Sequence, residues 1–217
     1  MVLSLFRDAP GWARFHTHVR WRLFPFPTLL PYVPSRGLAL DLGCGHGLFS
    51  FYLALEKPNL QIVGIDPDRE KIGLARDIAA RRGLPNLRFS VGMAEDVELP
   101  PCDVVSLVDV LYLIPYDAQE RLLRAAAARL SPGGRLLLKD MSERPRWKAA
   151  WGVAQELLAV RVLHITHGSK FYFRREREWL ELLGDLGLAA RAIPLHSGYL
   201  HPHVLFVGER RAATDCI

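Results

Sequence analysis

A glycine-rich segment, Asp41-Leu-Gly-Cys-Gly-His-Gly47, separates a short apolar run from a stretch with helical periodicity. Its three glycines permit a tight turn and let a ligand approach the backbone, and the next helix would offer free N–H groups. The spacing differs from the Gly-x-Gly-x-x-Gly dinucleotide fingerprint, because Leu48 stands where the third glycine would fall. The segment therefore predicts a ligand cradle and argues against an NAD-dependent dehydrogenase.

An acidic residue, Asp66, ends the next apolar run. A carboxylate at the tip of the second strand suits hydrogen bonds to both hydroxyls of a ribose. The competing interpretation makes Asp66 a helix N-cap, although Asp68 is better placed for that role. Two roles stay open for Asp41, which are direct ligand contact and ordering of the glycine loop. We expect Cys44 to be a small residue buried at the turn and not a nucleophile.

From position 37 to 140, short apolar runs alternate with longer stretches of helical periodicity, and the residues above lie between them. We predict strands at 38–42, 60–65, 87–91, 103–111 and 135–139, and helices at 48–56, 68–82 and 117–130. Apolar strands separated by helices indicate a parallel sheet covered on both faces, hence a doubly wound α/β fold. Beyond a helix at 174–186, strands at 188–195 and 203–208 lie too close in sequence for a parallel crossover, which favours an antiparallel pair.

The flanking segments predict helical cap elements over the sheet. Residues 12–24 mix aromatic, Arg and His side chains in a helix that a run of prolines then ends. A second amphipathic helix begins at Pro145 and extends to about residue 165. We therefore divide the chain into an N-terminal helical cap, residues 1–36, and a Rossmann-like domain, residues 37–217, with a helical insertion at about 141–173.

The composition is that of a globular protein, with 50% hydrophobic and 24% charged residues among 217. The three cysteines show no C-x-x-C spacing, which favours a reducing, cytoplasmic location over a disulfide framework. We find no apolar run near 18 residues and no secretory signal at the N-terminus.

The net charge of +5 is unevenly distributed along the chain. Residues 1–36 hold five arginines and one acid, and residues 141–177 hold eight basic and three acidic residues. Residues 37–140, in contrast, hold twelve basic and fourteen acidic residues. This division predicts a mildly acidic scaffold with two basic cap elements, and not a uniformly basic surface for nucleic acid.

Four segments in order carry a family resemblance: ALDLGCGHG at 39–47, VGIDPD at 63–68, VGMAEDVELPPCDVVSLVDVLYLIP at 91–115 and LSPGGRLLLKD at 130–140. In these segments the chain resembles the class I S-adenosylmethionine-dependent methyltransferases. The resemblance implies a seven-stranded sheet with an antiparallel last strand, and S-adenosylmethionine as cofactor with S-adenosylhomocysteine as product. It implies that Gly43 and Gly45 line the methionine portion, Asp66 holds the ribose, Ala94 and Glu95 flank the adenine, and Asp109 borders the methyl-donor site. The full predicted cofactor set is Asp41, Gly43, Cys44, Gly45, Gly47, Asp66, Pro67, Met93, Ala94, Glu95 and Asp109.

The chain departs from the family pattern at Met93. Many relatives read Gly-Asp-Ala where this chain reads Gly92-Met93-Ala94, so the carboxylate usually offered to the adenine amino group is absent. Met93 can stack on the ring instead, with Glu95 or Asp96 as the acceptor. The change bears on cofactor affinity more than on cofactor identity.

Methyl transfer from a sulfonium is an in-line displacement, so positioning can supply most of the catalysis, and a base is needed only for an acceptor of high pKa. The candidate catalytic residues are Tyr112, His164 and His167, and the candidate acceptor-binding residues are His16, Arg20, Trp147 and Trp151. From the basic N-terminal cap we expect Arg14, Arg20 and Arg22 to serve acceptor binding more than cofactor binding. For each histidine the competing interpretation is a surface or cap residue that only makes hydrogen bonds, and for the tryptophans it is core packing. The histidine pairs lack an Asp or Cys at familiar ligand spacing, so we expect no metal site.

We therefore predict a methyltransferase acting on a small-molecule or lipid-like acceptor, either anionic or presented by an acidic carrier protein. A nucleic-acid methyltransferase is one alternative, although the chain lacks the Asn/Asp-Pro-Pro-Tyr/Phe type of motif and an appended RNA-binding module. A non-catalytic regulatory protein that binds S-adenosylmethionine is another. The Trp, Phe and Arg residues of segment 12–30 also suit peripheral contact with a membrane. The sequence does not predict an oligomeric state.

Overall fold

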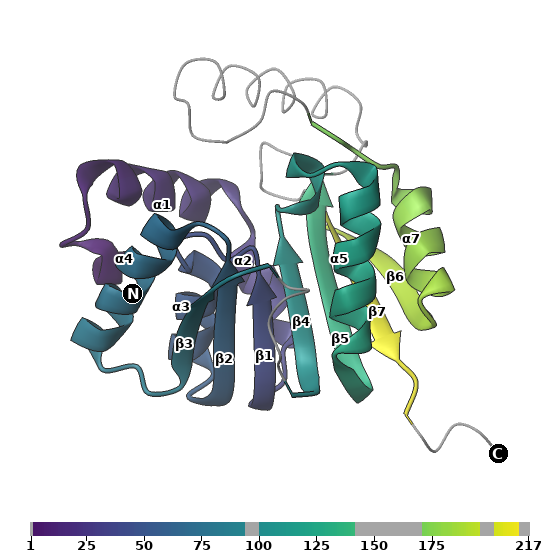
Figure 1. The fold of residues 1–217 in the computed structure, drawn as a ribbon, viewed down its shortest axis with the longest axis horizontal. Coiled ribbons are helices and arrows are strands. Elements are labelled where there is room, and N and C mark those ends of the chain that lie inside the picture. Colours follow the sequence, from purple (N-terminus) through teal and green to yellow (C-terminus); the bar gives the residue numbers. More distant parts are fainter. Residues whose placement is uncertain (1, 94–99, 142–170, 196–201, 213–217) are drawn as a thin grey trace.

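The computed structural model describes residues 2–93, 100–141, 171–195 and 202–212. Its centre is a seven-stranded sheet of order β3-β2-β1-β4-β5-β7-β6 (Figure 1). The strands are β1 Arg36–Leu42, β2 Asn59–Asp66, β3 Leu87–Val91, β4 Cys102–Val108, β5 Leu130–Met141, β6 Leu188–Pro194 and β7 His203–Arg210. The first five are parallel, and β7 is antiparallel to both β5 and β6. The predicted Rossmann-like sheet with an antiparallel last strand is confirmed.

The strand order reverses at β1, which pairs with β2 on one side and β4 on the other. The end of β1, Leu42, lies opposite Ile65 of β2 and Leu107 of β4. Loops that leave neighbouring strands in opposite directions open a crevice at their carboxyl ends, the usual ligand site of open α/β sheets. The glycine loop follows β1, Asp66 is the last residue of β2, and Asp109 follows β4.

Helices cover both faces of the sheet, as Figure 1 shows. The principal helices are α1 Gly11–Leu23, α3 Leu48–Glu56, α4 Arg69–Arg82, α5 Tyr116–Ala128 and α7 Glu176–Asp185. Side chains alternate along each strand: Ala39 packs with α3 and α4 on one face, whereas Leu40 packs with α5 and α7 on the other. This alternation gives the sheet two hydrophobic cores.

The N-terminal segment packs into the first of these cores. Phe6 and Ala13 are fully buried there, as are Phe26 and Leu29 of the short helix α2, Phe26–Leu29. The predicted helix at 12–24 is confirmed, and Pro25 follows its end. The division of the chain at residue 36 stays a prediction, and the helix expected from Pro145 lies outside the described residues.

Two strand boundaries differ from the sequence prediction. Strand β4 ends at Val108 and not at residue 111, because Asp109 adopts a left-handed backbone (φ 58°) and turns the chain into a short 3-10 helix, Leu111–Leu113. Strand β5 begins at Leu130 and not at residue 135, with a register shift opposite β4. The Ser-Pro-Gly-Gly stretch forms a bulge within β5, in which Gly133 has a φ of 79°.

Within the described residues, no helix combines the length and apolarity needed to cross a membrane.

Candidate active site

The glycine loop is fastened to the end of β2. The N–H groups of Gly43 and Cys44 donate to the carbonyl of Ile65 at 2.8 and 3.1 Å, and the Gly45 N–H donates to Asp66 Oδ2 at 2.8 Å. The loop glycines have positive φ angles, which L-residues avoid. A Cβ on Gly47 would lie 2.4 Å from the Phe89 ring, whereas one on Gly45 would meet open space.

Asp66 is nearly buried, and its two carboxylate oxygens accept different backbone N–H groups. Oδ2 accepts from Gly45, and Oδ1 accepts from Asp68 at 2.9 Å. The N-cap of α4 is Asp68, which accepts from the backbone N–H groups of Glu70 and Lys71. The alternative interpretation of Asp66 as the N-cap is therefore wrong, and Asp66 also lines the cleft described below.

Asp41 lies beneath the loop, where it is fully buried. Its carboxylate accepts hydrogen bonds from Ser50 Oγ of α3 at 2.5 Å and from Ser106 Oγ of β4 at 2.9 Å. Burial raises the pKa of Asp41 to about 6, against the opposing effect of both hydroxyls. These contacts fit loop ordering, one of the two roles that the sequence left open.

A buried charge cluster forms where β4 and β5 end. Asp109 accepts from Lys139 Nζ and, at 3.2 Å, from the Arg20 guanidinium of α1. The two cations lie over the Phe24 ring, with Lys139 Nζ 4.1 Å and Arg20 Cζ 4.6 Å from its centroid. Burial lowers the pKa of Lys139 to about 8, although Asp109 opposes this shift. Sequence reasoning missed Lys139, although a lysine in the apolar run Leu136-Leu-Leu-Lys139 was a usable signal.

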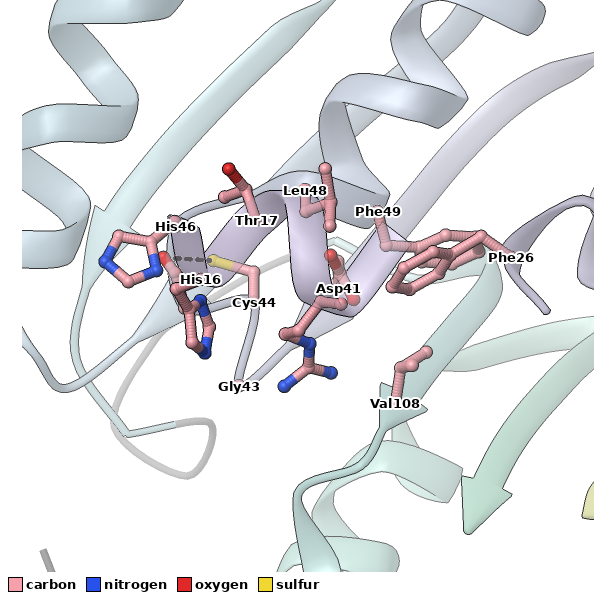
Figure 2. Close-up of a pocket in the computed structure, with 12 residues that line it drawn as sticks. His16, Thr17, Phe26, Asp41, Gly43, Cys44, His46, Leu48, Phe49 and Val108 are labelled. Atoms are coloured by element: carbon pink, nitrogen blue, oxygen red, sulfur yellow. Dashed lines mark hydrogen bonds between the residues drawn. The ribbon is translucent and has the colours of Figure 1, made fainter. Parts of the chain in front are cut away.

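A cleft of about 250 Å³ opens between α1 and the carboxyl ends of β1, β2 and β4. It is lined by His16, Arg20, Gly43, Gly45, His46, Asp66, Pro67, Lys71, Asp109, Val110, Tyr112, Leu113 and Ile114. A smaller cavity of about 50 Å³ lies beside it, between α1 and the glycine loop, with Asp41 and Cys44 in its wall (Figure 2). The structure thus brings most of the predicted cofactor residues to one place.

Two imidazoles meet above the glycine loop. The rings of His16 and His46 lie 5.1 Å apart, and Trp12 lies 5.0 Å from His46 (centroid distances). Burial, reinforced by nearby cations, lowers the pKa of His16 to about 3 and of His46 to about 4, so both are neutral at pH 7. His16 Nδ1 and His46 Nε2 are buried without a hydrogen-bond partner among the described residues. His46 was missed by sequence reasoning, although it is the single histidine of segment 37–140.

An aromatic wall of three rings lies beyond Asp109, and its ring Tyr112 lines the cleft. Tyr112 stacks on Phe173, with 5.5 Å between centroids and 18° between planes, and Phe171 packs 6.0 Å from Tyr112. Gln119 Nε2 holds this wall by donating to the carbonyls of Leu111, Ile114 and Tyr172 at 2.8–3.1 Å. Gln119 is fully buried. One amide thus joins the β4–α5 loop to the segment that precedes α7.

The other predicted residues fall into two groups. Met93 follows β3, and its side chain is half exposed. Burial raises the pKa of the Cys44 thiol well above its usual value, as expected for an unreactive cysteine. Six further candidates lie outside the described residues and stay predictions: Ala94, Glu95, Trp147, Trp151, His164 and His167.

Comparison with known proteins gives one family and several relatives. A family model described as a methyltransferase domain matches residues 5–193. The chain is 31% identical over 134 residues to a ubiquinone biosynthesis O-methyltransferase of Aeromonas salmonicida (60% of this chain, 54% of the relative). It is 34% identical over 146 residues to ribosomal RNA small subunit methyltransferase G of Alkalilimnicola ehrlichii (66% and 63%).

The similarity extends to solved structures. An O-methyltransferase family protein from Burkholderia thailandensis superposes with a TM-score of 0.74 at 19% identity, covering 97% of this chain and 62% of that protein. This likeness concerns the fold. The two curated relatives are matched over about half to two-thirds of their length.

Proposed function

The chain belongs to the class I S-adenosylmethionine-dependent methyltransferase family, and from this premise we propose that it methylates a small-molecule or lipid-like acceptor. The observation that carries the proposal is the cleft at the reversal point of the sheet, because His16 and Arg20 of α1 and the aromatic ring of Tyr112 line it. A concave site with polar and aromatic lining suits a compact, partly apolar ligand.

The residues of the cleft fit S-adenosylmethionine. Gly45 leaves open space where a side chain would stand, which is the condition for a ligand to approach the backbone. Asp66 offers carboxylate lone pairs at the position expected for ribose hydroxyls. Arg20 is partly exposed in the cleft wall and supplies a cation for an amino acid's carboxylate group. We assign Asp66 and Gly45 to cofactor binding, with Asp41 as a positioning residue.

When bound, S-adenosylmethionine supplies an electrophilic methyl group on a sulfonium. The protein's part is to hold the acceptor in line and to exclude water. Tyr112 lines the cleft next to Asp109, and Phe171 and Phe173 pack against it. The supported ring of Tyr112 suits a planar or apolar acceptor. The neutral His16 can accept a proton or hydrogen bond from an acceptor hydroxyl, although its depressed pKa makes it a weak base.

A nucleic-acid acceptor is the second candidate, and the similarity to ribosomal RNA methyltransferase G supports it. Against it, α1 narrows the approach to the cleft, and a base in a structured RNA would have to be flipped out to enter. The two candidates differ in their dependence on salt, because binding to a phosphate backbone weakens steeply as salt rises.

The test has two steps. Calorimetry with S-adenosylhomocysteine measures cofactor binding, and its absence at millimolar ligand would overturn the proposal. We then measure the transfer of a radiolabelled methyl group from S-adenosylmethionine to a panel of catechols and hydroxylated quinols. The same measurement is made in parallel with ribosomal RNA as the acceptor. Methylation of the phenolic panel supports the proposed function, whereas salt-sensitive methylation of RNA alone would replace it with the second candidate. Binding without transfer to any acceptor, including a cell extract, would indicate a non-catalytic protein.

A further inference from the structure

The outer side of α1 carries an exposed apolar stripe, made of Trp12, Phe15 and Val19. Their exposed fractions are 56%, 61% and 37%. At 100° per residue these three side chains fall within about 60° of the helix circumference, on one face. Long apolar side chains on a helix surface are usually covered, so a clustered exposed face indicates a partner.

The charge around the stripe is of one sign. Arg14, His18 and Arg22 are exposed along one flank, and no acidic residue occurs in α1. The opposite flank carries His16 and Arg20, which roof the cleft. An apolar stripe bordered by arginines is the pattern of helices that lie in the interface of a bilayer.

The other exposed apolar side chains occur near the same side of the molecule as the stripe. Among the residues that the structure describes, five large apolar side chains are exposed, and the two outside α1 are Met93 and Tyr116. Met93 follows the carboxyl end of β3, and Tyr116 begins α5 after the carboxyl end of β4. The elements that carry or adjoin these side chains, which are α1, the end of β3 and the start of α5, lie at the edge of the sheet formed by the carboxyl ends of the parallel strands (Figure 1).

We propose that the α1 outer stripe docks on the surface of an anionic phospholipid bilayer. The apolar side chains enter the headgroup boundary, and the flanking arginines face lipid phosphates. The arginines match the charge of anionic headgroups and the apolar side chains match the hydrocarbon beneath them, so charge and apolarity together favour an anionic bilayer. Docking in this orientation turns the cleft mouth toward the bilayer, from which a lipid-like acceptor could enter.

The experiment is flotation of the full chain with two kinds of vesicle, pure phosphatidylcholine and phosphatidylcholine with 30% phosphatidylglycerol. We expect the protein to float with the anionic vesicles, to be released at about 0.5 M salt, and to stay behind with neutral ones. Phe15→Ser with Val19→Ser should reduce the floated fraction at least five-fold, and Arg14→Gln with Arg22→Gln should do the same.

A matched control removes equal charge elsewhere. Arg121→Gln with Arg177→Gln replaces exposed arginines of α5 and α7, and it should float like the unaltered chain. Thermal unfolding verifies that each variant is folded.

The proposal would be overturned if the unaltered chain did not float with anionic vesicles, or if the stripe variant floated equally well. Light scattering that showed a dimer lost in the stripe variant would overturn it as well, because a second copy would then cover this face. Flotation needs no methyl transfer, so this proposal and the proposed function fail independently.

Discussion

At the scale of single residues, Asp66 connects the glycine loop to the proposed cofactor site. Its carboxylate accepts the N–H of Gly45 on one side and of Asp68 on the other, so one residue fixes the ends of β1 and β2 relative to each other. The same carboxylate lies in the wall of the cleft. Binding and loop geometry are therefore coupled at this position.

Asp66→Asn tests this coupling. The substitution keeps the shape but places an amide N–H₂ against a backbone donor. We expect S-adenosylhomocysteine affinity to fall about ten-fold or more, which is ~1.4 kcal/mol, and the free energy of unfolding to fall by about 1–2 kcal/mol. Calorimetry and urea unfolding measure the two effects. Asp77→Asn, on the exposed side of α4, should change neither. An affinity within two-fold of the unaltered chain would contradict the assignment.

His46 predicts a dependence of stability on pH. Its side chain is buried, and burial lowers its pKa to about 4 from an ordinary value of 6.5. The unfolded chain therefore binds the proton more readily, and this residue's contribution to stability is lost as pH falls from 6.5 toward 4.

We test this by unfolding the unaltered chain and His46→Gln at pH 7 and pH 5. Between pH 7 and pH 5, the unaltered chain should lose about 1–2 kcal/mol more free energy of unfolding than the variant does. The reason is that only the unaltered chain must keep His46 neutral when it folds. The buried acids Asp41 and Asp140 have raised pKa values and act in the opposite direction. Their effect is common to both proteins and cancels in the difference. A difference independent of pH would show that His46 is not buried in the neutral form.

At the scale of elements, the loop between β1 and α3 combines two kinds of glycine. Gly47 is the N-cap of α3 and packs against the Phe89 ring, whereas Gly45 faces open space. The first is needed for packing between α3 and β3, and the second for access to the backbone. Both have positive φ, so any side chain adds strain at either position.

Alanine at each position separates packing from access. Gly47→Ala should cost about 2–4 kcal/mol of stability, because its Cβ would overlap a ring that is itself packed in the core. Gly45→Ala should cost about 1 kcal/mol, from backbone strain alone, yet lower S-adenosylhomocysteine affinity at least ten-fold. Urea unfolding and calorimetry give both quantities for each variant. Equal stability losses, or unaltered binding by Gly45→Ala, would contradict this distinction.

At the scale of the whole molecule, the site is assembled from segments far apart in the chain. Arg20 of α1 and Lys139 of β5 both pair with Asp109, which follows β4. The N-terminal helix is therefore held over the cleft by a charge contact as well as by the shared hydrophobic core. The three arginines that the sequence grouped together differ in place: Arg20 lines the cleft, whereas Arg14 and Arg22 are exposed on the outer side of α1.

Neutralising these arginines separately tests that difference. Unlike the acceptor role expected from the sequence, the place of Arg20 in the cleft predicts a part in cofactor binding. Arg20→Gln removes a cation that lines the cleft and pairs with Asp109, so S-adenosylhomocysteine affinity should fall five- to ten-fold. Arg14→Gln with Arg22→Gln should leave that affinity unchanged within two-fold. Calorimetry on both variants at one salt concentration provides the comparison. If both variants lost S-adenosylhomocysteine affinity equally, the distinction between Arg20 and the two exposed arginines would be wrong.

The local chemistry of the chain was enough to predict much of this protein. The turn that only glycines allow, the N-cap at Asp68 and the apolar runs of the strands depend on neighbours in sequence, so the elements from 37 to 91 and the places of Gly43, Gly45 and Asp66 could be predicted. The left-handed turn at Asp109 was missed, because nothing adjacent to it requires that conformation.

The tertiary structure alone decided which distant groups meet. Strand order places β4 beside β1 and β5, and this brings Asp109 to Lys139 and to Arg20, 89 residues away. The same packing buries His46 and lowers its pKa, and it leaves Trp12 and Phe15 outside the core. Such contacts depend on burial and on crossover connections, which set distances that no spacing within the sequence specifies.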